Sequence, residues 1–398
     1  MTPLRYVSRR QQVARSNTPL IIRAFDAVQQ TNDSSAPFIQ EANFLYLTGI
    51  TEPGWIVMID ASGKSTLIAP DISESHRIFD GGLSNEQAQE VSGVDAVMGQ
   101  KEGLVLMKKL ITNSDAVYTL GPDPHEKYFS FAPNPGPKTM YDFVKKHAKE
   151  VVDIRKYMAK MRSIKQAEET ETMRRAIDRT CSSFSNVKRL LKSAKHEYTI
   201  DAEFTYSFRS IGATHAYEPI VAADKNACTL HYQKNNMELP NNGLILLDVG
   251  ARVDGYCADI TRTYAIGTPT ARQVAVHAAV EDAHRRIIKL IKPGGLLTEY
   301  QKNVDTIMKD ALQSLGLLKS RSDEKTYRKY FPHAIGHGLG LDVHESLGGF
   351  GEFKPGMVLT VEPGVYIPEE GIGVRIEDNI LVTNTGYENL SAALPTGL

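Results

Sequence analysis

Apolar residues recur every three or four positions in two long stretches of the chain, and shorter apolar runs follow each stretch. The first stretch, 163–191, has the spacing of an amphipathic helix of several turns, and Ser163 and Gln166 have the spacing of a capping box at its start. A second helix is predicted over 199–212. Three predicted strands follow, at 219–232, 243–250 and 256–264.

The same order recurs closer to the end of the chain. Residues 274–291 carry an apolar stripe of helical spacing that stops before Pro293 and Gly294, and 297–316 predict a second helix. Strand-like runs then continue to the end. Two helices followed by strands, twice over, indicate a duplicated architecture of pseudo-twofold helix-helix-strand repeats.

The pattern before residue 156 is different. Short β-rich runs, such as 54–60 and 64–70, alternate with helical stretches, which is typical of an α/β domain. The sequence therefore predicts two domains of an α/β (α+β) protein, 1–156 and 157–398. A chain of 398 residues with 41% hydrophobic content is large enough to form both cores.

Charge and hydropathy narrow the choice of partners. The net charge is −1 and basic residues occur in short pairs, so nucleic acid is not an expected partner. No apolar run approaches the roughly 18 residues of a membrane helix, and no secretory signal is found, so no membrane is expected either. Cys181, Cys228 and Cys257 are odd in number and far apart, which disfavours disulfides and favours a reducing compartment.

The beginning of the chain is basic. Its arginines precede the first acidic residue, Asp26, and predict a basic surface helix, with the remnant of an organelle-targeting segment as the weaker alternative. We therefore expect a cytoplasmic protein, with the mitochondrion as the other compartment. The arginines are Arg5, Arg9, Arg10 and Arg15.

Two aspartates interrupt the strands of the first repeat. Asp248 ends an apolar run, Asp254 and Gly255 supply a turn, and Asp259 lies on the returning strand, so a hairpin would bring both carboxylates within about one rung of each other. Taken alone, Asp248 suits a strand-end cap and Asp259 a surface position. If both face inward, they need cations or several hydrogen-bond donors.

Two glutamates, Glu362 and Glu377, interrupt the strands of the second repeat in the same way. Each alone could be an edge-strand charge, but four such interruptions favour convergence in one core. Converging carboxylates raise one another's pKa values, and divalent cations remove that repulsion. Four carboxylates balance two divalent ions, and Arg375, on the same predicted strand face as Glu377, would offset the charge of a metal-bound hydroxide.

Three of the chain's 11 histidines lie within 333–344. One neutral imidazole can complete a carboxylate-rich site, and we assign His337 to that role, whereas His333 taken alone could be a core residue. The glycines Gly336, Gly338 and Gly340 would let the backbone pass close to metals and substrate. No strand and helix flank them as in a nucleotide-binding loop, and oxygen-rich ligation suits manganese, iron or cobalt better than structural zinc.

Four segments resemble the metal-binding segments of the pita-bread metallopeptidases: 246–264, 333–345, 359–368 and 373–383. This resemblance covers about residues 157–398. Two further segments, 37–54 and 216–232, resemble aminopeptidase P, the Xaa-Pro aminopeptidases, including their creatinase-like amino-terminal domain. The resemblance implies a pita-bread catalytic domain at 157–398 after an α/β domain at 1–156.

The resemblance also implies the site residues. It places two divalent metal ions, most simply Mn²⁺ with Co²⁺, Fe²⁺ and Zn²⁺ as alternatives, on five ligands: Asp248, Asp259, His337, Glu362 and Glu377. It gives catalytic roles to a second set, in which Glu362 takes the proton of the attacking water: His231, His333, His344, Glu362 and Arg375.

The implied activity is release of the first residue from peptides with proline in second position, through attack by a hydroxide that bridges the two metals. A homodimer or larger homo-oligomer is implied as well. The nearest alternative is a prolidase, which accepts only Xaa-Pro dipeptides. A methionine aminopeptidase leaves the first 150 residues unexplained, and the complete ligand set disfavours both a metal-free creatinase-like hydrolase and a non-catalytic pita-bread binding module.

Overall fold

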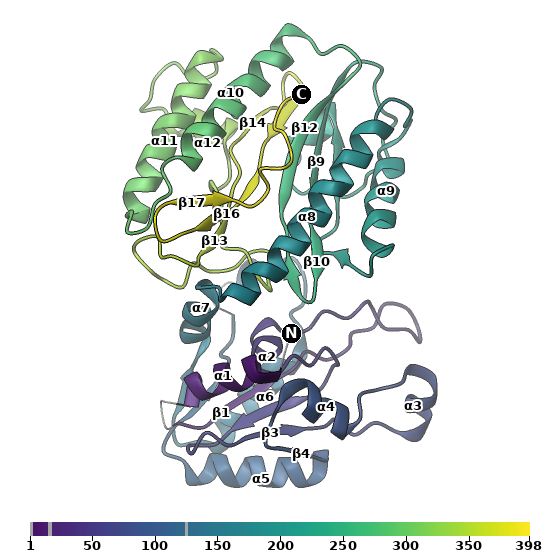
Figure 1. Cartoon of the computed structure of the whole chain (residues 1–398), viewed down its shortest axis with the longest axis vertical. Coiled ribbons are helices and arrows are strands. Elements are labelled where there is room, and N and C mark those ends of the chain that lie inside the picture. Colours follow the sequence, from purple (N-terminus) through teal and green to yellow (C-terminus); the bar gives the residue numbers. More distant parts are fainter. Residues whose placement is uncertain (1–2, 15–17, 124–125) are drawn as a thin grey trace. The chain divides into compact units, whose positions relative to one another are not determined.

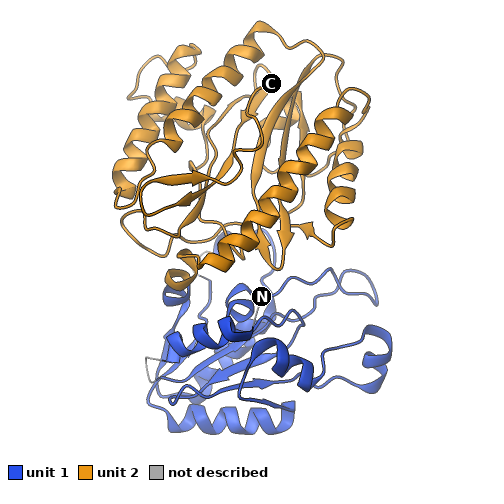
Figure 2. Ribbon diagram, viewed as in Figure 1, with its two compact units in different colours: residues 1–158 blue, residues 159–398 orange. Residues whose placement is uncertain are grey.

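The computed structural model describes residues 3–14, 18–123 and 126–398. The chain forms two compact units, Met1–Met158 and Ala159–Leu398 (Figure 2). Helix α7 (Arg155–Ser163) contains both this division and the boundary predicted at residue 156.

Unit 1 is built on a six-stranded sheet in the order β4-β3-β2-β1-β5-β6 (Figure 1). Strands β1, β2 and β3 pair antiparallel, whereas β4, β5 and β6 pair parallel to their neighbours. The alternation of strands and helices expected of an α/β domain is confirmed. The elements are α1 (Pro3–Ala14), β1 (Leu20–Arg23), α2 (Ala42–Thr48), β2 (Ile56–Ile59), β3 (Ser65–Ile68), α3 (Glu74–Asp80), α4 (Asn85–Ser92), β4 (Ala96–Met98), α5 (Gln100–Asn113), β5 (Val117–Thr119), α6 (Pro135–His147) and β6 (Val151–Asp153).

The prediction of a basic surface helix at the start is wrong for two of its arginines. Arg9 and Arg10 of α1 are buried, with 1% and 2% of their surface exposed. Arg10 donates to the carbonyl oxygens of Leu47 at 2.8 Å and Ser92 at 2.9 Å, so it binds the last turns of α2 and α4. The positive charge of Arg10 thus interacts with backbone carbonyl groups inside unit 1 rather than with solvent. Arg15 lies outside the described residues.

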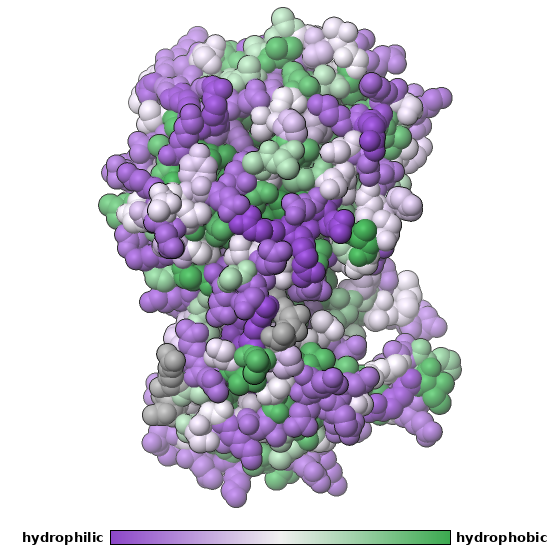
Figure 3. Space-filling model, viewed as in Figure 1, coloured by the Kyte–Doolittle hydropathy of each residue, from purple (hydrophilic) through white to green (hydrophobic). Residues whose placement is uncertain are grey.

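Helix α3 stands apart from the core of unit 1. None of its residues is buried, and it exposes Ile78 and Phe79 at 75% and 83%. Figure 3 shows apolar side chains gathered at this helix. The stability of unit 1 therefore rests on its sheet and on the apolar cluster between the sheet and helices α5 and α6, rather than on α3.

Each half of unit 2 begins with two long helices and ends in strands, as predicted, but in the second half a short third helix, α12, precedes the strands and was not predicted. Helices α8 and α9 lie on one side of the strands and α10 and α11 on the other (Figure 1). The mixed α/β class is confirmed. Its elements are α8 (Ala167–Leu190), α9 (Glu197–Arg209), β7 (Thr214–His215), β8 (Ile220–Ala223), β9 (Gly243–Val249), β10 (Ala251–Val253), β11 (Tyr256–Cys257), β12 (Ile260–Ile266), α10 (Ala271–Ile288), α11 (Leu297–Ser314), α12 (Glu324–Tyr330), β13 (Val358–Val361), β14 (Gly364–Ile367), β15 (Ile372–Arg375), β16 (Asp378–Val382) and β17 (Tyr387–Asn389).

Two predicted boundaries in unit 2 are wrong. Ser163 ends α7 instead of capping the next helix, and the capping box of α8 is formed by Gln166 with Glu169. The strand predicted over 219–232 stops at Ala223, because Asp224 takes a left-handed conformation (φ 46°) and starts a short 3-10 helix. Apolar content alone did not reveal this turn.

The predicted hairpin between the two aspartates is confirmed. Strands β9 and β12 pair antiparallel, and Asp254 and Gly255 both have positive φ (48° and 86°) at the turn between β10 and β11. Thr261 lies opposite Asp248 in the register. Asp259 lies just before β12 rather than on the strand, and it is close to Asp248 because one hydroxyl, that of Tyr217, contacts both carboxylates.

Arg262 of β12 ties the two halves of unit 2 together. Its guanidinium is fully buried and donates to the carbonyl oxygen of Glu377 at 2.6 Å, the carboxylate of Asp378 at 2.7 Å and the carbonyl oxygen of Leu394 at 2.7 Å. Removing one partner of such a buried ion pair costs about 3–5 kcal/mol. The position of the segment around Glu377 thus depends on a residue of the first half.

Neither a disulfide nor a membrane span is found in the described part of the chain. All three cysteines are free. Within the described ranges, no helix has both the length and the apolar character needed to cross a bilayer.

We predict that Gly250→Ala destabilises unit 2 by about 2 kcal/mol or more, since overpacking commonly costs about 1–3 kcal/mol. A Cβ at Gly250, between β9 and β10, would lie 1.9 Å from the carbonyl oxygen of Ala258. Gly386→Ala is the matched control, because nothing lies within 4 Å of its added Cβ. Urea denaturation of both variants measures the difference, and equal midpoints would contradict the prediction.

Candidate metal centre

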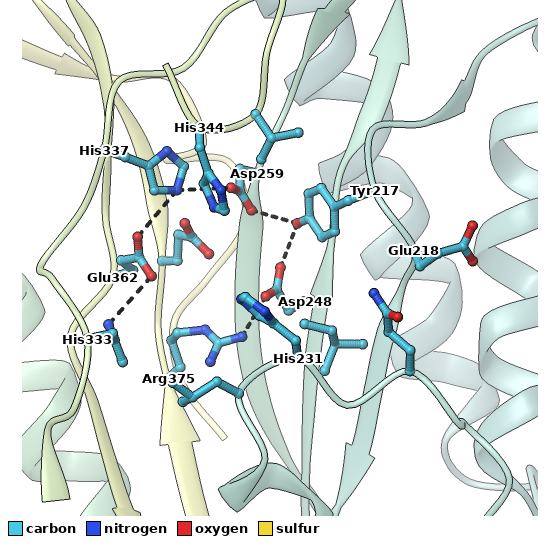
Figure 4. Close-up of a pocket in the computed structure, with 15 residues that line it drawn as sticks. Tyr217, Glu218, His231, Asp248, Asp259, His333, His337, His344, Glu362 and Arg375 are labelled. Atoms are coloured by element: carbon cyan, nitrogen blue, oxygen red, sulfur yellow. Dashed lines mark hydrogen bonds and ion pairs between the residues drawn. The ribbon is translucent and has the colours of Figure 1, made fainter. Parts of the chain in front are cut away.

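One cavity of about 260 Å³ in unit 2 is lined by every residue that the sequence predicted for the site (Figure 4). The predicted ligands and the predicted catalytic residues therefore lie together, although they are spread over more than 140 positions of the chain. The predicted residues are His231, Asp248, Asp259, His333, His337, His344, Glu362, Arg375 and Glu377.

Main-chain contacts position the residues from the second half. The N–H of His337 donates to Oγ1 of Thr360 at 3.0 Å, and the N–H of Thr360 donates to the carbonyl oxygen of His337 at 2.9 Å. Thr360 Oγ1 also donates to the Glu362 carboxylate at 3.1 Å. Strand β13 thus fixes an imidazole and a carboxylate at once.

Glu377, in the link between β15 and β16, is held from the first half. Its carboxylate accepts from Oγ1 of Thr261 at 2.7 Å, and its N–H donates to the carbonyl oxygen of Thr261 at 3.0 Å. Because Thr261 lies opposite Asp248 in the sheet, these bonds place Glu377 beside both aspartates.

The predicted ligand atoms are close enough to share a cation. His337 Nε2 lies 3.4 Å from an oxygen of Glu362 and 3.5 Å from an oxygen of Asp259 (Figure 4). Asp259, His337 and Glu377 each offer one ligand atom, and these three atoms lie within 4.8 Å of one another. The other two predicted ligands, Asp248 and Glu362, line the same cavity.

Three carboxylates of this cluster are energetically unfavourable as anions. Burial, followed by repulsion from Asp248, raises the pKa of Asp259 well above its usual value. Burial and repulsion from Asp259 do the same to the pKa of Glu377, and burial raises the pKa of Glu362 to about 7. Bound cations would relieve this cost, so the donor set fits divalent metal ions.

His337 is in the form that binds metals. Its Nδ1 lies 3.0 Å from the carbonyl oxygen of Gly338, which can only accept, so Nδ1 carries the proton and the lone pair of Nε2 faces the carboxylates. Burial and the neighbouring His344 lower the pKa of His337 to about 4. A neutral imidazole oriented by a carbonyl group is the usual arrangement of a histidine ligand.

Arg375 is held inside the cavity wall. Its guanidinium donates to Asp248 at 2.5 Å, to the hydroxyl of Tyr366 at 2.8 Å and to Oγ1 of Thr261 at 3.1 Å. It is buried and supplies a positive charge directly beside the acidic cluster.

Tyr217 was not predicted from the sequence. Its hydroxyl oxygen lies 2.5 Å from Asp248 and 2.6 Å from Asp259 (Figure 4). Burial and the two carboxylates raise its pKa far above the usual value, so the phenol stays neutral and its single proton serves both acids. One tyrosine among 17 gives no signal in a single sequence, and only the fold shows this contact.

The other three histidines that the sequence predicted for the site, His231, His333 and His344, lie around the carboxylate cluster. The ring of His344 packs edge-on against His337, with centroids 4.3 Å apart. His333 Nδ1 donates to the carbonyl oxygen of Ala334 at 2.7 Å, so its Nε2 accepts from the Tyr366 hydroxyl at 2.9 Å. The orientation of the His333 ring is therefore fixed. His231 lines the cavity from the loop that follows β8.

A buried ion cluster supports the segment that carries His337 and His344. The carboxylate of Glu345 binds Arg162 at 2.5 Å and Lys165 at 2.8 Å, and it accepts from the N–H of Leu341 at 2.9 Å. The two cations hold the pKa of Glu345 at about 2 despite burial. No pattern in the sequence indicates that positions 162 and 345 are in contact.

The three glycines of this segment are needed for close packing, and their expected role in letting the backbone approach metals and substrate stays a prediction. A Cβ at Gly336 would lie 2.1 Å from the carbonyl oxygen of Thr360, and a Cβ at Gly340 would lie 2.6 Å from the carboxylate of Glu345. At Gly338 the nearest atom is the carbonyl oxygen of Glu345, at 2.8 Å. The glycines make room for β13 and for the supporting ion cluster.

Two family models match the chain. Residues 171–384 match metallopeptidase family M24, and residues 6–118 match the aminopeptidase P, N-terminal domain. The first match lies in unit 2 and covers more than half of the chain, and the second lies in unit 1.

Named relatives and solved structures agree with these matches. The chain is 32% identical to the Xaa-Pro aminopeptidase of Escherichia coli (97% of this chain, 94% of the relative) and 32% identical to the human Xaa-Pro aminopeptidase 3 (92% and 76%). A structure of Escherichia coli aminopeptidase P in complex with substrate is 29% identical, with a TM-score of 0.88 (100% and 96%). A structure of a putative aminopeptidase P from Bacillus anthracis is 30% identical, with a TM-score of 0.89 (99% and 96%).

We predict that Tyr217→Phe weakens metal binding by about tenfold or more, the usual effect of losing a hydrogen bond to a ligand. The variant leaves Asp248 and Asp259 without their shared donor. Calorimetric titration of metal-free protein with Mn²⁺ measures the affinity. Tyr206→Phe is the control because Tyr206 is 70% exposed, and equal affinities in both variants would argue against this role of Tyr217.

The raised pKa of Glu362 predicts a pH-dependent gain of stability for Glu362→Gln in metal-free protein. Glutamine resembles the protonated acid, so the two proteins have similar stability below about pH 4.5. As pH rises to 7, only the wild type must ionise a buried carboxyl, and its relative stability falls by about 3 kcal/mol (2.5 pH units at 1.36 kcal/mol each).

Denaturation curves at several pH values, with and without Mn²⁺, measure this difference. Saturating metal should reverse the order, because the wild-type carboxylate gains a cation. If the free energy of unfolding of the two metal-free proteins changed with pH in the same way, Glu362 would not be a buried carboxyl with a raised pKa.

Proposed function

The chain belongs to metallopeptidase family M24 and carries the amino-terminal domain of aminopeptidase P, and from this membership we propose that it releases the first residue from peptides with proline in second position. It is a metal-dependent peptide hydrolase. The observation that carries the proposal is the convergence of four carboxylates and one neutral imidazole in a single cavity.

Five residues are proposed to hold two divalent ions. Four carboxylates balance two divalent charges, and Arg375 adds one positive charge beside Asp248. The ligand set has four oxygen donors and one nitrogen donor, which favours manganese among the candidate metals. Bound divalent ions polarise a carbonyl group and lower the pKa of water toward neutrality. The proposed ligands are Asp248, Asp259, His337, Glu362 and Glu377.

Glu362 is the proposed proton acceptor for the attacking water. It lies at the end of β13, and its carboxylate receives a hydrogen bond from Thr360, which fixes its direction. A second oxygen lies 3.8 Å from His333 Nδ1. The site therefore has an oriented base next to the cluster, as general base catalysis requires.

His231 and His344 are the proposed donors to the substrate. Both line the cavity next to the carboxylates, and the His344 ring is held against His337. In these positions, an imidazole N–H can stabilise the oxyanion that develops on the scissile carbonyl, or protonate the leaving nitrogen. His333 is proposed to shape the wall and to hold Tyr366 and Arg375 in place.

Proline in second position needs a particular wall, because its amide is tertiary and offers no N–H. His333 packs edge-on against Phe331 and Tyr366, with centroids 4.9 Å and 5.5 Å apart. This aromatic wall can pack against a pyrrolidine ring without requiring a donor from the substrate. We propose that the ring binds there.

The named relatives disfavour the prolidase alternative, because several that match more than nine tenths of the chain are named Xaa-Pro aminopeptidases. The compartment and the assembly stay predictions: cytoplasm or mitochondrion, and a homodimer or larger homo-oligomer. A relative from Arabidopsis thaliana, 28% identical, is named as a mitochondrial intermediate cleaving peptidase.

The test uses full-length protein freed of metal by chelation and then supplied with Mn²⁺. We expect release of alanine from Ala-Pro-Ala and little release from Ala-Ala-Ala. Cleavage of Ala-Pro alone would change the assignment to prolidase, and the absence of any cleavage by the metal-loaded protein would refute the proposal.

Matched variants connect this activity to the cluster. Asp259→Asn should lose both bound metal, measured by elemental analysis, and cleavage of Ala-Pro-Ala. Asp178→Asn, at an exposed position of α8, should keep both. Full metal content in Asp259→Asn would remove Asp259 from the ligand set.

A further inference from the structure

One acidic residue of the cavity takes no part in the proposed metal centre. Glu218 lines the cavity next to Tyr217, and its side chain is exposed. Across residues 3–14, 18–123 and 126–398, no hydrogen bond or ion pair engages its carboxylate. A charged group at a ligand cavity without a partner in the protein is available to the ligand.

The arginine that lines the cavity contacts another acid, not Glu218. The four other acids that line the cavity are the proposed metal ligands, and the lining arginine, Arg375, binds Asp248. Glu218 is thus the one acid of the lining that is neither a proposed metal ligand nor paired with Arg375.

The position of Glu218 in the cavity indicates which end of a bound peptide it would contact. Figure 4 shows His333 and Arg375 on one side of the carboxylate cluster and Glu218 on the opposite side, beyond Tyr217. The scissile amide must lie at the cluster, between these two ends. If the pyrrolidine ring packs at the aromatic wall near His333, the first residue of the peptide extends toward Glu218.

The direction in which the Glu218 side chain points determines which part of the peptide its carboxylate can contact. In Figure 4 the Glu218 carboxylate points away from Asp248 and Asp259. The free α-amine of the peptide would lie near the cluster, behind the Glu218 carboxylate and out of its reach. The end of a long side chain on the first residue could extend far enough to meet that carboxylate. Ile220 and Leu230 line the same cavity and offer apolar surface for the methylene groups of such a side chain.

We propose that Glu218 selects peptides whose first residue is arginine or lysine, by pairing with the cationic end of that side chain. This selectivity rests on the proposed function. Because Glu218 is exposed, the pair contributes like a surface ion pair, so we expect a preference of about fivefold, or about 1 kcal/mol at 1.4 kcal/mol per tenfold.

The experiment compares Arg-Pro-Ala with citrulline-Pro-Ala, which has nearly the same shape but no charge. Values of kcat/KM are measured for the manganese-loaded full chain. The wild type should prefer arginine about fivefold, and Glu218→Gln should reduce the ratio to about one. The preference should also shrink at 0.5 M salt because the pair is exposed. Glu171→Gln, at an exposed position of α8, should keep the wild-type ratio.

Other outcomes would overturn the assignment. An unchanged ratio in Glu218→Gln would show that its carboxylate does not contact the first side chain, even if both rates fall together. A Glu218-dependent preference for Ala-Pro-Arg over Ala-Pro-citrulline would place Glu218 at the other end of the peptide. Hydrolysis of Ala-Pro-Ala without any charge preference refutes only this inference, whereas no hydrolysis of any peptide refutes the proposed function as well.

Discussion

Repulsion among buried carboxylates is the constraint on which the rest of unit 2 depends. Asp259 and Glu377 have raised pKa values because they are buried beside one another and beside Asp248. A fold gains no stability from placing such groups together in the absence of cations. The cluster therefore persists at the expense of stability in the metal-free protein, and the gain appears only when cations bind. This difference in stability between the metal-free and the metal-bound protein links the packing of the core to its chemistry.

Several neutral or positive groups limit that repulsion without removing it. Tyr217 shares one proton between two aspartates, Thr261 donates to Glu377, and Arg375 donates to Asp248. Each contact fixes a carboxylate oxygen in direction, which leaves the remaining lone pairs facing the cavity. These contacts reduce the repulsion between the carboxylates enough for the protein to fold. The lone pairs that accept no hydrogen bond stay available to metal ions.

The sequence predicted the local parts of this arrangement and missed the contacts between distant segments. The turn at Asp254 and Gly255 and the helical spacing over 167–190 depend on neighbours within a few residues, so they could be recognised in one sequence. The four acids that interrupt predicted strands and the histidine-rich segment indicated a metal site, and the resemblance to a known family implied the same five ligands. Tyr217 and the pairing of Arg162 with Glu345 depend on tertiary packing, and no periodicity marks such residues. The burial of Arg9 and Arg10 was missed for the same reason: a basic helix looks the same whether its charges meet water or carbonyl groups.

The duplicated halves explain why the site can form only in the packed unit. The first half contributes the two aspartates, and the second contributes His337, Glu362 and Glu377. Neither set alone surrounds a position with enough ligands for two ions. Bonds that cross between the halves, from Arg262 to Asp378 and from Thr261 to Glu377, set the distance between the two sets. Metal binding therefore favours the same packing that these crossing bonds favour, and the ions act as a further link between the halves.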